Sequence, residues 1–185
     1  MAGTDYKRSF SSLDEALEGC AAPVEIRETL ALVDVPYVSF CGSLRQGQLL
    51  VHKLLKEDVL TIFKLLAQMK FPIELIESLS TYGWDDESSM IANNTSAFNY
   101  RLILETDRLS NHSLGCAIDI NPALNPYRSY AGKIYPPNAT YDPTVPGTIT
   151  GGGEVVALFK SMGWEWGGDW TSVIDYQHFQ KTVEK

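Results

Sequence analysis

The stretch Ser110-Asn-His-Ser-Leu-Gly-Cys-Ala-Ile-Asp119 places an imidazole and a carboxylate on either side of a short strand-like run. A second pair of such groups, in Asp175-Tyr-Gln-His178, lies near the C-terminus. Neutral imidazoles and one carboxylate, with the fourth position left open for water, are what a catalytic zinc ion requires. The hypothesis is therefore that His112, Asp119 and His178 are the ligands of a Zn²⁺ ion.

The local pattern supports this hypothesis, because the residues from Gly115 to Ile120 resemble a half-buried strand. Side chains of a strand alternate between its two faces, so Ala117 and Asp119 share one face, and small residues there leave room for a metal and a substrate. Cys116 points to the opposite face and cannot bind the same ion from a regular strand. His112 precedes the strand in a polar turn that can fold its ring over the open face.

The two motifs and their flanks resemble the M15 zinc peptidases of bacterial cell walls. These include D-Ala-D-Ala carboxypeptidases and dipeptidases, and L-alanyl-D-glutamate endopeptidases. The similar segments, residues 93–101, 110–122 and 163–180, follow the order of the family and cover about the C-terminal half of the chain. The resemblance implies an α+β fold, in which a small, mainly antiparallel sheet is flanked by helices, as in the Hedgehog and DD-peptidase domains. It also implies that the substrate is the stem peptide of peptidoglycan.

A general base is expected three residues before the last proposed ligand. Asp175 stands there, close enough to His178 to touch a metal-bound water without binding the metal itself. Glu165 and Asp169 are the alternative bases. Asp175 is the preferred one because of its spacing from His178.

Arg101 is the position that best matches an arginine which, in the M15 family, precedes the histidine motif and binds substrate. The planar fork of an arginine suits a substrate carboxylate or a carbonyl oxygen. Spacing alone equally permits a structural ion pair for Arg101, and Arg108 is an alternative nearer His112.

Two further residues are assigned to substrate binding. The hydroxyl of Ser110 either orients the groups around the metal or only shapes the turn before His112. Trp170 ends the run Trp164-Glu-Trp-Gly-Gly-Asp-Trp170, whose aromatic side chains either pack against substrate or belong to the core.

Composition excludes several classes of protein. The net charge of −8, with 15 scattered Lys and Arg residues, argues against a nucleic-acid surface. Three cysteines are too few for a disulfide framework, although a single Cys20–Cys41 bridge is permitted. No segment approaches the ~20 apolar residues of a membrane span, and the N-terminus does not resemble a signal peptide. Action in the bacterial cell wall or outside the cell is then expected through a trimmed leader or a phage-like lysis route.

The chain is long enough for one domain with a sizeable core. Residues 1–35 are expected to be an N-terminal extension packed on a catalytic domain of residues 36–185. Residues 37–41 and 48–52 have the pattern of two strands joined by a tight connection. Residues 56–70 are the clearest amphipathic helix.

The remaining segments are predicted from their turn-forming residues. Residues 84–90 are expected to be a solvated acidic loop. Residues 121–153, rich in Pro, Gly, Asn and Tyr, are expected to form a long loop that walls the substrate groove. Residues 154–162 predict a short helix that ends at Gly163. His52, which stands alone beside apolar residues, is expected to be structural rather than a ligand.

The expected function is zinc-dependent hydrolysis of the peptidoglycan stem peptide. Trp-Gly-Gly-Asp-Trp joined to Asp-x-x-His-Phe-Gln most resembles the L-alanyl-D-glutamate endopeptidases, so that cleavage is placed first and D-Ala-D-Ala carboxypeptidase second. A catalytically silent zinc-binding module is a further alternative. A serine hydrolase using Asp175 and His178 is disfavoured, because no Gly-x-Ser-x-Gly elbow is present.

Overall fold

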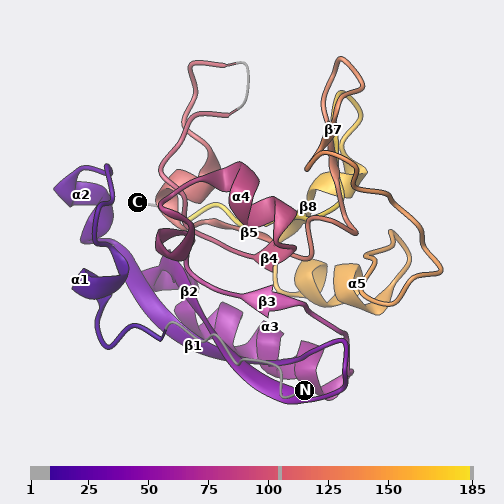
Figure 1. Cartoon of the computed structure of the whole chain (residues 1–185), viewed down its shortest axis with the longest axis horizontal. Coiled ribbons are helices and arrows are strands. Elements are labelled where there is room, and N and C mark those ends of the chain that lie inside the picture. The colour runs from indigo at the N-terminus through magenta and orange to yellow at the C-terminus, as the bar shows by residue number, and fades with distance from the viewer. Residues whose placement is uncertain (1–8, 104–105, 184–185) are drawn as a thin grey trace.

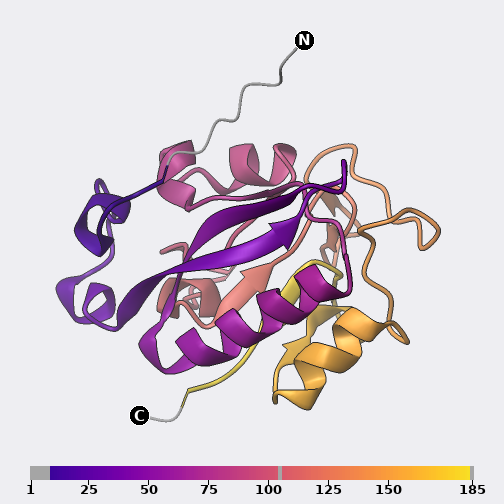
Figure 2. The ribbon, with the colours of Figure 1, turned by 90° about the horizontal axis from the view of Figure 1, so that it is seen from below.

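A long antiparallel hairpin forms one side of the protein in this computed structural model, which describes residues 9–103 and 106–183 (Figures 1 and 2). Its strands are β1 (Leu30–Val38) and β2 (Leu44–His52). The register is regular from Leu30 opposite His52 to Val38 opposite Leu44. The predicted hairpin is therefore confirmed.

The first strand of the hairpin starts earlier than predicted, at Leu30 rather than at residue 37. Pro36, which lies inside β1, lacks a backbone N–H, but a two-stranded sheet has only edge strands and tolerates it. β1 thus runs through residue 35, where the N-terminal extension was expected to end. The division of the chain into residues 1–35 and 36–185 stays a prediction.

Helix α3 (Lys56–Gln68) packs on β1, with the short 3₁₀ helix η1 (Lys53–Leu55) leading into it (Figure 2). The amphipathic pattern predicted this helix correctly. The side chains at its buried face are Val59, Ile62, Phe63 and Leu66. Full burial of such a side chain contributes roughly 1.5–3 kcal/mol, so this face fixes the helix on the hairpin.

Helix α5 (Glu154–Ser161) completes the main core beside α3, and it is also close to its predicted position. It ends before Gly163, whose φ of 80° only glycine adopts readily. Phe159 of α5 stacks on Phe179, with ring centroids 3.8 Å apart. The core is thereby continuous from α3 to the C-terminal strand.

The remaining strands are short and divided among small sheets, mostly antiparallel. One sheet has the order β5 (Ala117–Asp119), β10 (His178–Gln180), β8 (Glu165–Trp166), and η4 (Gly167–Asp169) follows β8. A parallel pair joins β3 (Leu75–Ile76) to β4 (Asn94–Thr95). The architecture is compatible with the expected α+β class, although the strands form several small sheets rather than one.

Two segments expected to be loops contain regular structure. Residues 84–90 include most of helix α4 (Asp86–Ile91), because Asp85 caps it and accepts a hydrogen bond from the Ser88 N–H at 2.9 Å. η2 (Leu79–Tyr82) precedes this helix. Residues 121–153 include the antiparallel pair β6 (Tyr127–Arg128) and β7 (Ile134–Tyr135), and β6 also pairs with β9 (Ile174–Asp175).

The N-terminal helices α1 (Leu13–Ala16) and α2 (Val24–Arg27) lie at the end of the hairpin (Figures 1 and 2). Ser12 caps α1 as predicted, and its hydroxyl accepts from the Glu15 N–H. A second hydrophobic cluster holds this region against Leu50 and Phe98.

Cys20, Cys41 and Cys116 are all free thiols, so the permitted Cys20–Cys41 bridge is not formed. Among the described residues, no helix is both long and apolar enough to cross a membrane.

Candidate metal centre and active-site pocket

The turn before β5 positions His112 through local hydrogen bonds. It forms the 3₁₀ helix η3 (Asn111–Leu114), and the hydroxyl of Ser110 accepts the His112 N–H at 3.3 Å. Gly115 ends η3 with a φ of 66°. Ser110 therefore shapes the turn, one of the two roles considered for it, and it also lines the pocket described below.

Strand pairing brings Asp119 to His178. In the antiparallel ladder of β5 and β10, Asp119 is directly opposite His178, and Ile118 is opposite Phe179. Opposite residues on an antiparallel pair project from the same face of the sheet. As the alternation predicted, Cys116 and Ile118 belong to the hydrophobic core.

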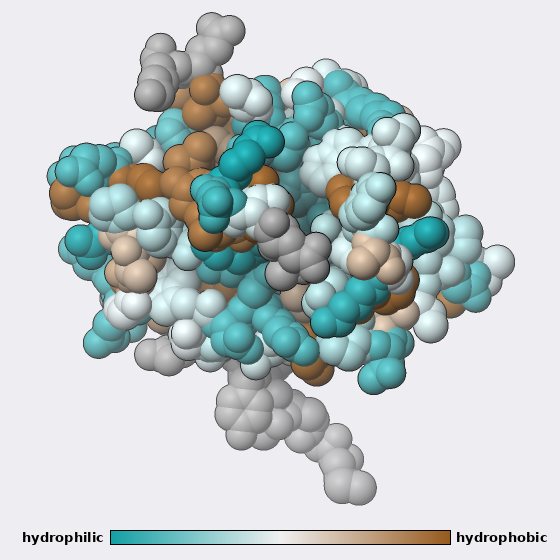
Figure 3. Space-filling model, turned by 90° about the horizontal axis from the view of Figure 1, so that it is seen from above, coloured by the Kyte–Doolittle hydropathy of each residue, from teal (hydrophilic) through white to brown (hydrophobic). Residues whose placement is uncertain are grey.

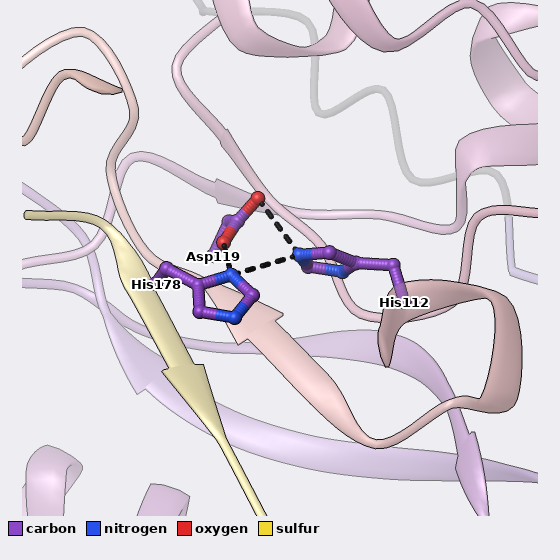
Figure 4. A group of neighbouring side chains, drawn as sticks. All are labelled: His112, Asp119 and His178. Carbon is purple, nitrogen blue, oxygen red and sulfur yellow. Dashed lines mark hydrogen bonds and ion pairs between the residues drawn. The ribbon is translucent and has the colours of Figure 1, made fainter. Parts of the chain in front are cut away.

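The three proposed ligands form one buried cluster (Figure 4). His112 Nε2 lies 3.1 Å from Asp119 Oδ2 and 3.1 Å from His178 Nδ1, and His178 Nδ1 lies 3.0 Å from Asp119 Oδ1. One ligand atom from each residue lies within 4.8 Å of the others. Two imidazole nitrogens and one carboxylate oxygen at this spacing are a donor set that suits a zinc ion.

The outer ring nitrogens have their own partners. His112 Nδ1 faces the carbonyl oxygen of Ala97, and His178 Nε2 faces Gln180 Oε1 at 3.1 Å. Both partners accept hydrogen bonds, so a proton on each outer nitrogen would satisfy them and leave the inner nitrogen, which faces Asp119, for a metal. In metal sites such second hydrogen bonds orient the histidine ligands.

Gln180 is itself held by two neighbours. Its Oε1 accepts from Asn111 Nδ2 at 2.6 Å, and its Nε2 donates to Glu165 Oε2 at 2.9 Å. Glu165 is exposed and acts on His178 only through Gln180, which places this alternative base outside the pocket lining. Sequence reasoning missed Gln180, although it stands two residues after His178 and hence on the same face of the strand.

Burial and mutual charge control protonation in the cluster. Burial would raise the pKa of Asp119, but the charges and hydrogen bonds of His112 and His178 hold that pKa well below its usual range. Burial is the largest single effect and lowers the pKa of His178, but the hydrogen bond to Asp119, the charges of Asp119 and Asp175 and the hydrogen bond to Gln180 together outweigh it, so the net shift is upward. The cluster therefore keeps an ionised carboxylate available as a ligand.

The cluster opens into a pocket of about 610 Å³, on the face shown in Figure 3. Tyr127, Tyr130 and Tyr135 of the β6–β7 region line it, which confirms that the 121–153 segment walls the groove. Trp170 also lines the pocket, with its ring centroid 5.2 Å from that of His178. By contrast, Trp164 and Trp166 are core residues, so the aromatic run is divided between the pocket lining and the core.

Asp175 lines the same pocket from β9. Its Oδ1 is shielded from solvent and has no hydrogen-bond partner among the described residues. Burial, followed by the negative charge of Asp119, raises the pKa of Asp175. A carboxylate with a raised pKa beside a metal-ligand cluster can take up and return a proton.

Of the other candidate residues, only Arg101 lines the pocket, whereas Arg108 and Asp169 do not. Arg101 lines the pocket and pairs with Asp86, whose Oδ2 lies 3.1 Å from Arg101 Nε. Arg108 is exposed and does not line the pocket. Asp169 pairs with Lys160 at 2.6 Å and is likewise absent from the lining.

His52 lies outside the cluster, as expected. Its Nδ1 accepts the Leu54 N–H at 3.3 Å and caps η1. Burial, followed by the charge of Lys53, lowers its pKa. Its role in the structure is thus a local cap.

A family model described as D-alanyl-D-alanine carboxypeptidase, one of the M15 peptidase models, matches residues 105–181. No curated protein and no solved structure matches the chain. The matched segment contains His112, Asp119, Asp175 and His178, so the resemblance read from the two motifs is confirmed. The match over residues 105–181 supports an M15 family peptidase.

Proposed function

We propose that this protein is a zinc peptidase that hydrolyses the peptidoglycan stem peptide, at the bond between L-Ala and D-Glu. The observation that carries the proposal is the convergence of His112, Asp119 and His178 on one point of a pocket that also contains Asp175. The donor set fits zinc, because an acceptor faces the outer nitrogen of each imidazole and the inner nitrogens converge with the Asp119 carboxylate.

The reaction follows from the positions of these groups. When bound, a zinc ion supplies a Lewis acid that activates water and polarises a carbonyl group. Asp175 accepts the proton of the attacking water and returns it to the leaving amine. Arg101 donates hydrogen bonds to a substrate oxygen, and Trp170 packs against the peptide. This route needs no acyl-enzyme.

The choice of an endopeptidase rests on the sequence run Trp-Gly-Gly-Asp-Trp followed by Asp-x-x-His-Phe-Gln, which most resembles the L-alanyl-D-glutamate endopeptidases. Among the described lining residues Arg101 is the only lysine or arginine, and the acidic lining residues are Asp85, Asp86, Glu87, Asp119 and Asp175. A carboxylate stands near the scissile bond in either substrate, on D-Glu or on the terminal D-Ala. In both cases it would have to lie near Arg101 or the metal rather than near the acidic lining.

D-Ala-D-Ala carboxypeptidase is the second candidate, because the description of the matching family model names that activity. Both activities place the enzyme at the bacterial cell wall or outside the cell. They differ in the product: an endopeptidase releases the whole peptide that begins at D-Glu, whereas a carboxypeptidase removes only the terminal D-Ala.

Mass analysis of a muropeptide digest tests the proposal. Wild-type protein loaded with zinc is expected to release the peptide that begins at D-Glu, and addition of a chelator is expected to abolish that release. Loss of terminal D-Ala alone would replace the first candidate by the second. A protein that binds zinc but cleaves no wall fragment would instead be a silent zinc-binding module.

A further inference from the structure

The carboxylate of Asp86 binds two side chains from the segment that leads to the metal site. Its Oδ2 lies 3.1 Å from Arg101 Nε, and its Oδ1 accepts from Asn99 Nδ2 at 3.0 Å. Both oxygens are thus in use. Asp86 stands in the first turn of α4, which Asp85 caps, so its backbone position is fixed by a helix terminus.

Stability alone does not account for this ion pair. The side chains of Arg101 and Asp86 are 31% and 30% exposed, and pairs with that degree of exposure contribute little to folding free energy. The contact is an ion pair rather than a hydrogen bond, since Arg101 Nε has no hydrogen-bond partner among the described residues. Together with the 3.5 Å hydrogen bond from Arg101 Nη1 to the Leu102 carbonyl oxygen, this ion pair still restricts where the planar guanidinium can lie. Arg101 and Asp86 both line the pocket.

The backbone on either side of Arg101 is also anchored. Ser113 Oγ accepts the Arg101 N–H at 2.9 Å and donates to the Arg101 carbonyl at 2.7 Å. Ser113 belongs to η3, the element that carries His112. The arginine is therefore fixed to the metal-site turn through its main chain and to α4 through its side chain.

We propose that Asp86 is a positioning residue that holds the Arg101 guanidinium in the orientation needed to bind a substrate oxygen. This inference rests on the proposed function, in which Arg101 contacts the substrate. Misplacement of such a group by about 1 Å costs up to about 10²-fold in rate, so a loss of about tenfold in kcat/KM is expected when Asp86 is removed.

A double-mutant cycle tests the pairing. Asp86→Ala is expected to lower kcat/KM about tenfold in the wild-type background and to have almost no further effect in Arg101→Ala, because the group that it positions is then absent. Asp86→Asn keeps the shape and one acceptor, so a smaller loss is expected. Losses that simply multiply in the double variant would overturn the proposal.

Asp58→Ala is the matched control, because Asp58 also stands in the first turn of a helix and pairs with a cation, Lys181, at 2.6 Å, but it does not line the pocket. The side chains of that pair are 26% and 29% exposed, so the two ion pairs are alike in burial. Asp58→Ala is expected to leave kcat/KM within about twofold. An equal loss of kcat/KM in the Asp58→Ala and Asp86→Ala variants would show a general effect of losing an ion pair and contradict the positioning role.

A second measurement does not depend on activity. The NMR signal of the Arg101 Nε–H, assigned by its absence in Arg101→Lys, is expected to shift in Asp86→Ala, which removes the nearby charge, and to stay in place in Asp58→Ala. An unchanged signal in Asp86→Ala would overturn the pairing. If wild-type protein cleaves no peptide, the proposed function fails, whereas this signal still decides whether Asp86 holds Arg101.

Discussion

Asp175 differs from Asp119 and Asp86 in having no partner for Oδ1 among the described residues. Asp119 is held by two histidines and Asp86 by Arg101 and Asn99, so neither is free to exchange protons. The raised pKa of Asp175 fits a group that takes up a proton during the reaction.

Asp175→Asn is therefore expected to retain zinc and fold but to lower kcat by ~10²- to 10⁴-fold, because an amide cannot act as the base. Metal analysis and peptide hydrolysis check this together. Glu165→Gln is the control, since Glu165 contacts only Gln180 and should keep most of the activity. The assignment of the base is wrong if Asp175→Asn stays active and Glu165→Gln does not.

Gln177 is a second polar residue whose side chain is incompletely bonded. It is 2% exposed, and its Oε1 has no hydrogen-bond partner among the described residues. Its Nε2 lies 3.9 Å from the sulfur of Met90, and its side chain also hydrogen-bonds Asp175. An unpaired buried acceptor costs roughly 1–3 kcal/mol.

Gln177→Met keeps the length of the side chain and removes the unpaired acceptor together with the hydrogen bond to Asp175. The two effects are expected to offset each other and to change the free energy of unfolding by less than about 1 kcal/mol in denaturant titration. Asn125→Leu is the matched control. All polar groups of that buried amide are bonded, and its partners are Ile120, Asn121, Gly147 and Ile149. Equal destabilisation by the two substitutions would mean that the Gln177 amide is satisfied in solution.

The residues of the metal cluster could be predicted from sequence, but their supporting partners could not. His112, Asp119 and His178 stand in motifs with informative spacing and flanks. The partner of Arg101 was not predicted, because Asp86 lies in an acidic run that resembles a solvated loop, and only the fold brings α4 beside residue 101. The carbonyl oxygen of Ala97 is a backbone group without any side-chain signal.

At the scale of elements, the junction of η3 and β5 is packed closely against the hairpin. A Cβ on Gly115 would lie 2.6 Å from the backbone nitrogen of His52 and 2.8 Å from Leu30 Cδ2. The turn that carries His112 therefore rests directly on the hairpin. The φ of 66° at residue 115 is a second reason why this position needs glycine.

Gly115→Ala is expected to destabilise the protein by about 1–3 kcal/mol more than Gly42→Ala, because overpacking adds to the cost of the left-handed backbone. Gly42 also has a positive φ, of 81°, but no atom lies within 4 Å of its Cβ position. Denaturant unfolding measures the difference, and zinc content should fall only in Gly115→Ala. Similar losses in both variants would contradict the close packing of η3 on the hairpin.

Elements with a strong periodic pattern were predictable, whereas short ones were not. α3 and α5 each bury one face, and each ends shortly before a stop signal, Pro72 after α3 and Gly163 after α5. The sequence therefore identifies both helices. β1 was placed too late, because Pro36 suggests a strand boundary although an edge strand accepts it. β6 and β7 are two residues each and depend on pairing with β9, which is distant in sequence.

At the scale of the whole molecule, one core supports both halves of the chain. Val33 and Ile62 from the first half share a hydrophobic cluster with Ile118 and Phe179, which lie beside the proposed ligands Asp119 and His178. The metal cluster therefore stands on a framework that is built largely outside the segment matched by the family model. Periodicity predicts the pieces of such a framework but not how they pack.

The central claim is that His112, Asp119 and His178 hold one zinc ion, and metal analysis of purified protein tests it most directly. Wild-type protein is expected to contain about one zinc ion per chain, and His112→Ala and His178→Ala to contain almost none. His52→Ala, which removes the remaining histidine, should keep its zinc, because His52 only caps η1. Full zinc content in both ligand variants, or loss of zinc in His52→Ala alone, would contradict the claim.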